Sequence, residues 1–412
     1  MLMRTSTEIP NFIMRLGFLS AFFVPLLFID KIYYPSILVC FMTVGTYGFA
    51  YSYLPYEMPV YFAMTVIFVI VQKCKCKVSQ ISPMFLITLM FLLFRNIIDS
   101  FDPQNIFYCV AIIGMFCLVI DKEDNHNVQQ CLLYTFIIIS ISLSLLYFLN
   151  YDQFVEDYDA KQGLERSGWI DPNYFSCVLG MGGLSAFILL LKDRCRWLMK
   201  LLLLFTMIIS FITQVILASR GGALAITVSV LILLLFSRIR FTYKIISLGF
   251  VICLVIWMYS NGYFQLLEHR IQTDSGGGSG RLDIWEAKMN FFFNHGHLLH
   301  WLFGFGYQSG FELAGTEGIG VGFHNDFVAV LCEYGILGLI VFVYWFSYPF
   351  FRAIKENKII ILSMLTYLFV VCATLEPISS GALPYFAFYF TILQLSKKEI
   401  LGISDPNLYG EE

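Results

Sequence analysis

The chain has 412 residues, of which 58% are hydrophobic and only 13% are charged. Ordinary soluble domains carry about twice that share of charged residues, so this composition excludes a soluble fold. The apolar content also excludes an intrinsically disordered chain. The formal net charge of −3 excludes a nucleic-acid-binding role, which would need a basic face.

Apolar runs follow one another along most of the chain, without the alternation of a membrane β-barrel. A membrane-spanning helix needs about 20 such residues, so the sequence predicts an all-α polytopic integral membrane protein with about 12 or 13 transmembrane helices. The runs lie near 11–29, 33–52, 58–72, 80–94, 106–120, 131–149, 173–191, 198–218, 222–236, 245–260, 325–346, 359–375 and 384–395.

The basic residues predict the orientation of these helices. Alternate turns (73–77, 192–200, 238–244, 352–358 and 397–398) hold 15 Lys and Arg. The other connections (95–105, 150–172, 219–221, 261–323 and 376–383) hold 7 over much more chain. Basic loops remain on the cytoplasmic side, so the second set is expected to face outward. Arg4 and Arg15 favour an inside N-terminus, which would make one of the first three runs short or re-entrant.

The predicted organisation has five parts. The chain is expected to divide into N-terminal transmembrane helices (1–149), an outward loop (150–172), central transmembrane helices (173–260), a large outward loop (261–323), and C-terminal transmembrane helices with a cytoplasmic tail (324–412). The large loop contains a glycine-rich linker at 273–280. The aromatic segment 281–293 after it is expected to form an amphipathic helix at the membrane surface.

Arg220 stands at the membrane edge, within the segment 218–222 (ASRGG). Its two glycines are expected to form the tight turn between two helices, which does not itself require an arginine. The guanidinium either snorkels to the interface or binds an anion, and its planar fork suits phosphate oxygens. Arg281 and Arg166, in the two outward loops, are either solvated charges or further parts of a diphosphate clamp.

His324 directly precedes an apolar run, and five of the six histidines lie between positions 269 and 324. Its ordinary pKa suits a general base, although a histidine flanking a span is the alternative. The helix start at 323–328 is also expected to offer free backbone N–H groups to an anion. The sequence H-x-H-x-x-H at 295–300 leaves zinc as an alternative, but no further ligand completes it, so no metal or other cofactor is predicted.

Short motifs follow one another around the large loop: 171–173 (DPN), 219–222 (SRGG), 281–285 (RLDIW), 304–306 (GFG), 323–325 (FHN) and 333–338 (EYGILG). In this order they resemble the O-antigen polymerase and O-antigen ligase superfamily of bacterial polytopic glycosyltransferases. The resemblance covers roughly residues 160–345. Glu333, Gly335 and Gly338 are interpreted as helix-packing residues.

The resemblance implies a GT-C-like, metal-independent, inverting glycosyltransferase of the bacterial inner membrane, with its active site facing the periplasm. It implies an undecaprenyl-diphosphate-linked oligosaccharide as donor and another as acceptor, no cofactor, and a chain-length regulator protein as a partner. His324 would be the catalytic base, and Arg220, Arg281 and Arg166 would bind the diphosphate. The supporting residues would be Asn325, Trp285 and Tyr307.

Three activities remain open at this stage. The acidic, aromatic loop 150–172 with Arg166 favours a polymerase, which transfers the growing glycan to another lipid-linked repeat unit. The alternative is a ligase, which transfers the glycan to lipid A-core. A secondary transporter is a remoter alternative, because the sequence shows neither an internal repeat nor a matched pair of broken helices.

Overall fold

A computed structural model gives the fold of the protein. It describes residues 33–47, 87–93, 112, 125–149, 155–159, 164–167, 171–191, 196–237, 241–262, 264, 265, 268, 281–306, 309, 322–379 and 383–396.

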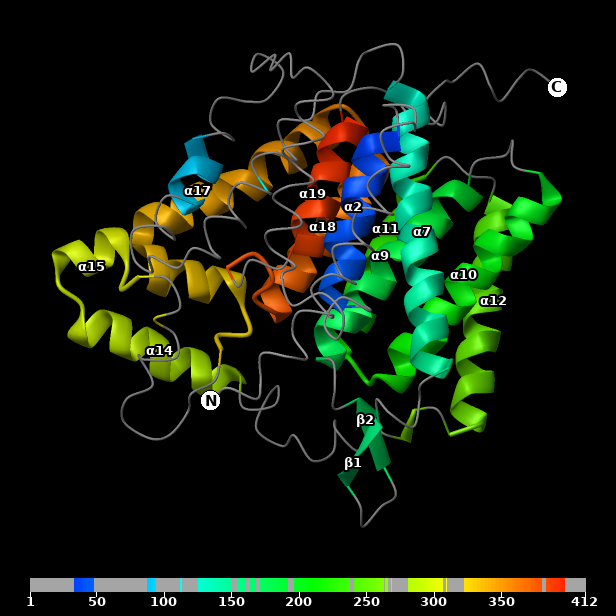
Figure 1. Cartoon of the computed structure of the whole chain (residues 1–412), viewed down its shortest axis with the longest axis horizontal. Helices are drawn as coiled ribbons and strands as arrows, with labels where there is room; N and C mark the ends of the chain where they lie inside the picture. The colour runs from blue at the N-terminus through cyan, green and yellow to red at the C-terminus, as the bar shows by residue number, and fades with distance from the viewer. Residues whose placement is uncertain are drawn as a thin grey trace, which may run out of the picture.

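The described residues form a bundle of apolar helices (Figure 1). Its helices are α2 (Tyr34–Tyr47), α7 (Asn125–Leu149), α9 (Pro172–Leu190), α10 (Trp197–Ile216), α11 (Arg220–Phe236), α12 (Phe241–Ser260), α17 (Asp326–Lys355), α18 (Ile359–Thr374) and α19 (Leu383–Ser396). Within the described residues, four helices are long and apolar enough to cross a membrane: α7, α9, α10 and α17. The predicted class, an all-α polytopic membrane protein, is thereby confirmed. Most of the N-terminal runs lie outside the described residues, so the total of 12 or 13 spans stays a prediction.

A short β-hairpin interrupts the helices between α7 and α9. Strands β1 (Val155–Asp159) and β2 (Leu164–Ser167) are antiparallel and pair Glu156 with Arg166. The sequence predicted an outward loop at 150–172 but no strands within it. A two-stranded sheet leaves open edges that need water, so the hairpin agrees with a position outside the hydrocarbon layer.

Helix α9 lies at the centre of the bundle, where three glycines bring neighbouring helices close. A Cβ atom at Gly180 would overlap the Tyr367 hydroxyl of α18, and one at Gly182 would overlap Ser140 of α7. One at Gly183 would lie 3.3 Å from Ser210 of α10. Small residues of this kind allow helix backbones to approach in a membrane. The central helix can therefore pack against α7, α10 and α18 together.

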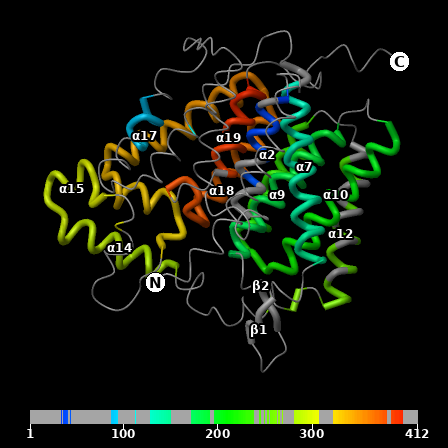
Figure 2. Tube along the Cα trace, viewed as in Figure 1, coloured from blue at the N-terminus to red at the C-terminus, as the bar shows by residue number. Residues whose placement is uncertain are grey.

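The outer part of the large loop forms two helices that pack against α17. These are α14 (Arg281–His295) and α15 (Leu298–Phe303), which lie on the opposite side of the molecule from α10 and α12 (Figure 2). The buried face of α14 includes Lys288 and Phe292. The predicted helix at 281–293 therefore exists, and its buried side packs on the protein.

Helix α17 is broken at Gly335, where the backbone takes φ 70° and ψ −169°. The residues after α15 bond to the carbonyl groups at this break: the Phe305 N–H donates to Cys332 (2.8 Å) and the Gly306 N–H to Glu333 (3.0 Å). The two glycine motifs of the sequence therefore pack against each other. Residues 336–355, after the break, extend about 30 Å, which is enough to cross a bilayer.

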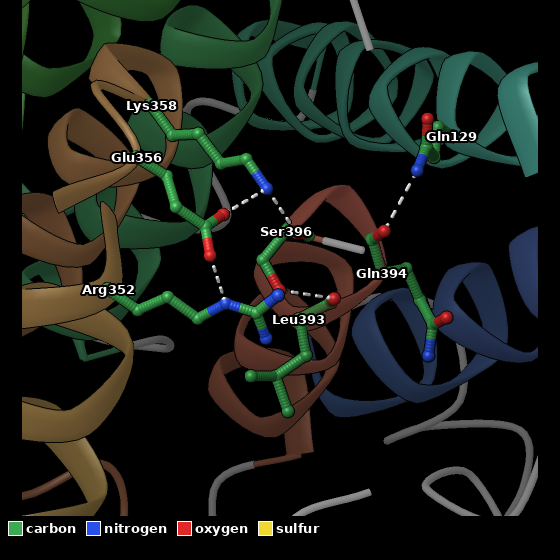
Figure 3. A network of polar contacts seen from close by, with 7 residues as sticks. All are labelled: Gln129, Arg352, Glu356, Lys358, Leu393, Gln394 and Ser396. Carbon is green, nitrogen blue, oxygen red and sulfur yellow. Dashed lines mark hydrogen bonds and ion pairs between the residues drawn. The ribbon is translucent and has the colours of Figure 1, made fainter. Parts of the chain in front are cut away.

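The C-terminal ends of α17 and α19 and the N-terminal end of α18 meet at the basic turn 352–358 (Figure 3). We call this end of the bundle the basic face. The Lys358 ammonium lies 2.6 Å from Glu356 and donates to the Ser396 carbonyl at 2.7 Å. Arg352 pairs with Glu356 at 2.7 Å, and the Gln129 amide of α7 donates to Gln394 of α19 at 2.8 Å. We call the other end, where α9, α11 and α17 begin, the outer face, after its predicted orientation.

Gly335→Ala is expected to lower the free energy of unfolding by about 1–3 kcal/mol. The new Cβ would overlap the Leu302 backbone, and φ 70° is unfavourable for alanine. Thermal unfolding in detergent measures the effect. Gly249→Ala in α12 is the control, because a Cβ there meets nothing within 4 Å and alanine favours a helix. An unchanged unfolding midpoint for Gly335→Ala would contradict the packing role of the break.

Candidate functional site

The carbonyl end of α18 organises the outer face. The last carbonyl groups of a helix have no partner within the helix. Three consecutive ones accept hydrogen bonds from segments that carry predicted site residues: Ala373 from the Asn325 side chain (3.1 Å), Thr374 from the Arg281 guanidinium (2.8 Å), and Leu375 from the Asp326 N–H (3.0 Å). The end of α18 thus joins the starts of α14 and α17.

The start of α11, which carries Arg220, reaches the same point on α18. Arg220 is the first residue of the helix and is half-buried, and the Ser219 side chain caps the helix by accepting the Gly222 N–H. A Cβ at Gly221 would lie 2.6 Å from the Thr374 hydroxyl, so this glycine permits the close approach. Thr374 therefore contacts both Gly221, next to Arg220, and the guanidinium of Arg281.

The expectation that the glycines of 218–222 form the turn is wrong. The residue with a positive φ in this turn is Ala218 (φ 49°), whereas Gly221 and Gly222 lie inside the first turn of α11. Their lack of a side chain instead makes room for Thr374 and for the Ser176 hydroxyl of α9. The role of these glycines is therefore to permit close packing between helices, which the local sequence does not show.

Two carboxylates, the buried Asp326 and the half-buried Glu376, connect the start of α17 with the turn after α18. Asp326 accepts N–H groups from Ile378 (3.1 Å) and Ser379 (2.8 Å). In the reverse direction, Glu376 accepts the Phe323 N–H at 2.7 Å. The bonds are reciprocal, because each segment supplies a carboxylate to the backbone of the other. They fix the backbone on both sides of His324.

His324 lies between these contacts with a left-handed backbone, φ 51°, which is uncommon outside glycine. Burial lowers the pKa of its imidazole, and the positive charges of Arg281 and Lys288 lower it further, against an opposing effect of Asp171. Its Nδ1 atom is buried and has no hydrogen-bond partner among the described residues. The lowered pKa favours the neutral ring, which is the state that a general base requires.

The prediction of free backbone N–H groups at 323–328 is wrong for Phe323, Asp326, Phe327 and Val328. The Asn325 side chain accepts the N–H groups of Phe327 (2.9 Å) and Val328 (3.2 Å) as the N-cap of α17. Phe323 and Asp326 donate to Glu376 and Leu375. This helix start is thus occupied by protein acceptors. The positive charge of the site therefore comes from side chains and not from free backbone N–H groups.

Of the predicted supporting residues, Trp285 donates its indole N–H to the Phe323 carbonyl at 2.7 Å, and Asn325 caps α17. Tyr307 lies outside the described residues. Arg166 lies in β2, but its side chain is outside the described part of the chain. The structure therefore places Arg281, Trp285, His324 and Asn325 close together. Arg220 lies next to Gly221, which packs on Thr374, the residue that accepts from Arg281.

The histidines of the large loop have local contacts. His295 stacks on Phe291 with ring centroids 4.5 Å apart, and His300 stacks on Phe305 at 4.4 Å. His297 is the N-cap of α15, and its N–H donates to the His300 ring. In the part of the chain that is described, no group of three or more His, Cys, Asp or Glu has an arrangement suited to a metal ion.

Sequence reasoning missed Lys288 and Glu376. Lys288 is buried on α14, with its ammonium 4.2 Å from the centroid of the Phe323 ring. Burial lowers its pKa, against the opposing charges of Glu376 and Glu333. The sequence contained a signal for Lys288, because Arg281, Trp285 and Lys288 have the spacing of one helix face. Glu376, a single carboxylate after an apolar run, had no such pattern.

The fold and the site thus define a multi-pass membrane protein with cationic and histidine side chains at one end of its helices. Residues 205–343 match the family model described as O-antigen ligase. This segment, about a third of the chain, contains Arg220, Arg281 and His324 and confirms the predicted resemblance to the O-antigen polymerase and ligase superfamily. The search of curated proteins finds no match to the chain.

The pKa of His324 is expected to lie below its ordinary value of 6.5, and Asp171→Asn is expected to lower it further. Asparagine preserves the helix cap of α9 but removes the charge that favours the imidazolium. Mass spectrometry can follow diethylpyrocarbonate modification of His324, which requires the neutral ring, as a function of pH. Asp283→Asn, at an exposed position on α14, is the control. A midpoint above 6.5 in the wild type would contradict this assignment.

Proposed function

We propose that this protein is an O-antigen polymerase, a glycosyltransferase that acts at the periplasmic side of the bacterial inner membrane. Its donor is a growing glycan on undecaprenyl diphosphate, and its acceptor is the non-reducing-end sugar of another lipid-linked repeat unit. The observation that carries the proposal is the meeting of Arg281, Asn325 (which follows His324) and the start of α11 at the end of α18. The family match over 205–343 supports it.

In this proposal His324 is the general base and the arginines bind the leaving group. The acceptor hydroxyl attacks the anomeric carbon of the donor sugar, and His324 takes the hydroxyl proton. The bond from that carbon to the diphosphate oxygen breaks, and undecaprenyl diphosphate leaves with the bonding electrons. Attack opposite the leaving group inverts the anomeric configuration. Arg220 and Arg281 stabilise the charge that develops on the diphosphate, as preorganised cations at a membrane edge do effectively.

The position of Arg281 suits this role. Its contact with the Thr374 carbonyl fixes the guanidinium, and a cation is favourable at the negative end of a helix. A fixed cation needs little reorganisation when the leaving group becomes charged. Arg166 is a third diphosphate ligand in the proposal, carried by the hairpin. A chain-length regulator protein is proposed as a partner.

The second candidate function is the transfer of the finished glycan to lipid A-core. The description of the matching family, O-antigen ligase, favours it. The two reactions share the donor, the leaving group and the need for a base, and they differ in the acceptor. The acidic loop 150–172, with its hairpin and Arg166, is the feature on which the choice of polymerase rests.

Purified wild-type protein supplied with lipid-linked repeat units alone, in the presence of EDTA, is expected to produce a ladder of glycan lengths. His324→Ala is expected to abolish the ladder while its thermal unfolding remains similar to that of the wild type. Product formed only after lipid A-core is added would identify a ligase instead. Transport of the lipid-linked substrate without any covalent product would overturn both candidates.

Arg281→Lys and Arg220→Lys are each expected to lower the transfer rate by about 10²–10³-fold, because an ammonium cannot replace the bidentate guanidinium fork. Initial rates at saturating donor measure the effect. Arg352→Lys on the basic face is the matched control, since that arginine pairs with Glu356 at the opposite end of α17 from the site. Wild-type rates for both variants would mean that these arginines only flank the membrane.

A further inference from the structure

Both backbone polar groups of Phe323, the residue directly before the proposed base, are hydrogen-bonded to side chains. Its N–H donates to Glu376 (2.7 Å) and its carbonyl accepts from Trp285 (2.7 Å). Its ring lies under the Lys288 ammonium at 4.2 Å. We call Glu376, Trp285 and Lys288 the Phe323 clamp.

The Phe323 clamp lies next to a residue whose backbone conformation is unfavourable. His324 takes φ 51°, and such a conformation persists in a non-glycine residue only when its surroundings impose it. Strain of this kind costs about 1–3 kcal/mol. The bonds on Phe323 lie one residue before the strained position, and those of Asp326 lie two residues after it. The contacts of the neighbouring residues therefore impose the backbone conformation of His324.

Glu376 is the central member of the clamp. It lies in the turn after α18, and its carboxylate reaches both Phe323 and the neighbourhood of Gly322, where a Cβ would overlap Oε1. Burial raises the pKa of Glu376, while the backbone N–H groups of Phe323 and His324 and the charge of Lys288 lower it. The carboxylate thus bonds to the backbone of the proposed base and lies in the field of a buried ammonium.

We infer that Glu376 is a positioning residue for the transfer reaction, which holds the backbone of His324 in its left-handed conformation and so aims the imidazole at the acceptor hydroxyl. This inference rests on the proposed role of His324 as the base. Glu376 itself touches neither donor nor acceptor in this role. It lies outside the segment 205–343 that matches the family model.

A positioning role predicts a specific kinetic pattern. A displacement of about 1 Å at a reacting group lowers the rate by about 10²-fold. Glu376→Ala is therefore expected to lower kcat by about 10–100-fold with the KM for the lipid-linked donor unchanged, since the arginines remain. Glu376→Gln keeps an oxygen that accepts the Phe323 N–H and is expected to recover most of kcat. Glu356→Ala on the basic face is the matched control.

A second variant reaches the same contact from its other side. Gly322→Ala places a Cβ on the Glu376 carboxylate and is expected to lower kcat as Glu376→Ala does. The double variant removes the overlapping group, so its kcat should be no lower than that of Glu376→Ala alone. Independent, multiplying effects would overturn the inference, because uncoupled sites behave additively.

A readout without substrate separates the inference from the proposed function. The rate of diethylpyrocarbonate modification of His324 is expected to change in Glu376→Ala and to stay unchanged in Glu356→Ala. If the wild type transfers no glycan, the proposed function fails, and this rate alone decides whether Glu376 positions His324. A wild-type kcat or modification rate in Glu376→Ala, or no recovery in Glu376→Gln, would overturn the inference.

Discussion

The arrangement of the outer face depends on the unsatisfied carbonyl groups at the end of α18. Hydrogen-bond donors from α14 and from the start of α17 occupy three consecutive carbonyls, and a glycine of α11 packs on the side chain of the middle residue. A helix of any sequence leaves such groups at its end. Here they fix the relative positions of segments that are nearly a hundred residues apart, as with Arg281 and Thr374. The resulting site combines a fixed cation with a histidine whose pKa is lowered.

The helices and several site residues followed from patterns that are local in sequence. Long apolar runs predicted α7, α9, α10 and α17, because the bilayer core requires them whatever the neighbours are. Arg281 and His324 stood out since ionised or titratable side chains are scarce in such a chain. Their proximity was inferred by resemblance, and the contacts at α18 now supply its physical basis.

The remaining features required contacts between distant segments. The role of Glu376 depends on its hydrogen bond with the Phe323 N–H, more than fifty residues earlier in the chain. No pattern around position 376 predicts that bond. The same holds for the glycines of 218–222, whose use depends on Thr374 and Ser176. The start of α17 was interpreted as an open anion site because its N–H groups were considered without the side chain of Asn325. Partners far along the chain decided each of these outcomes.

The break of α17 at Gly335 has a mechanical consequence. It divides the helix into an outer segment, 326–334, bound to the end of α18, and a longer segment that reaches the basic face. Transmembrane helices adapt to bilayers of different thickness by tilting. A continuous α17 would transmit such a tilt to His324, but a helix interrupted at a glycine acts as a joint. We therefore expect the geometry around His324 to be insulated from changes in lipid thickness.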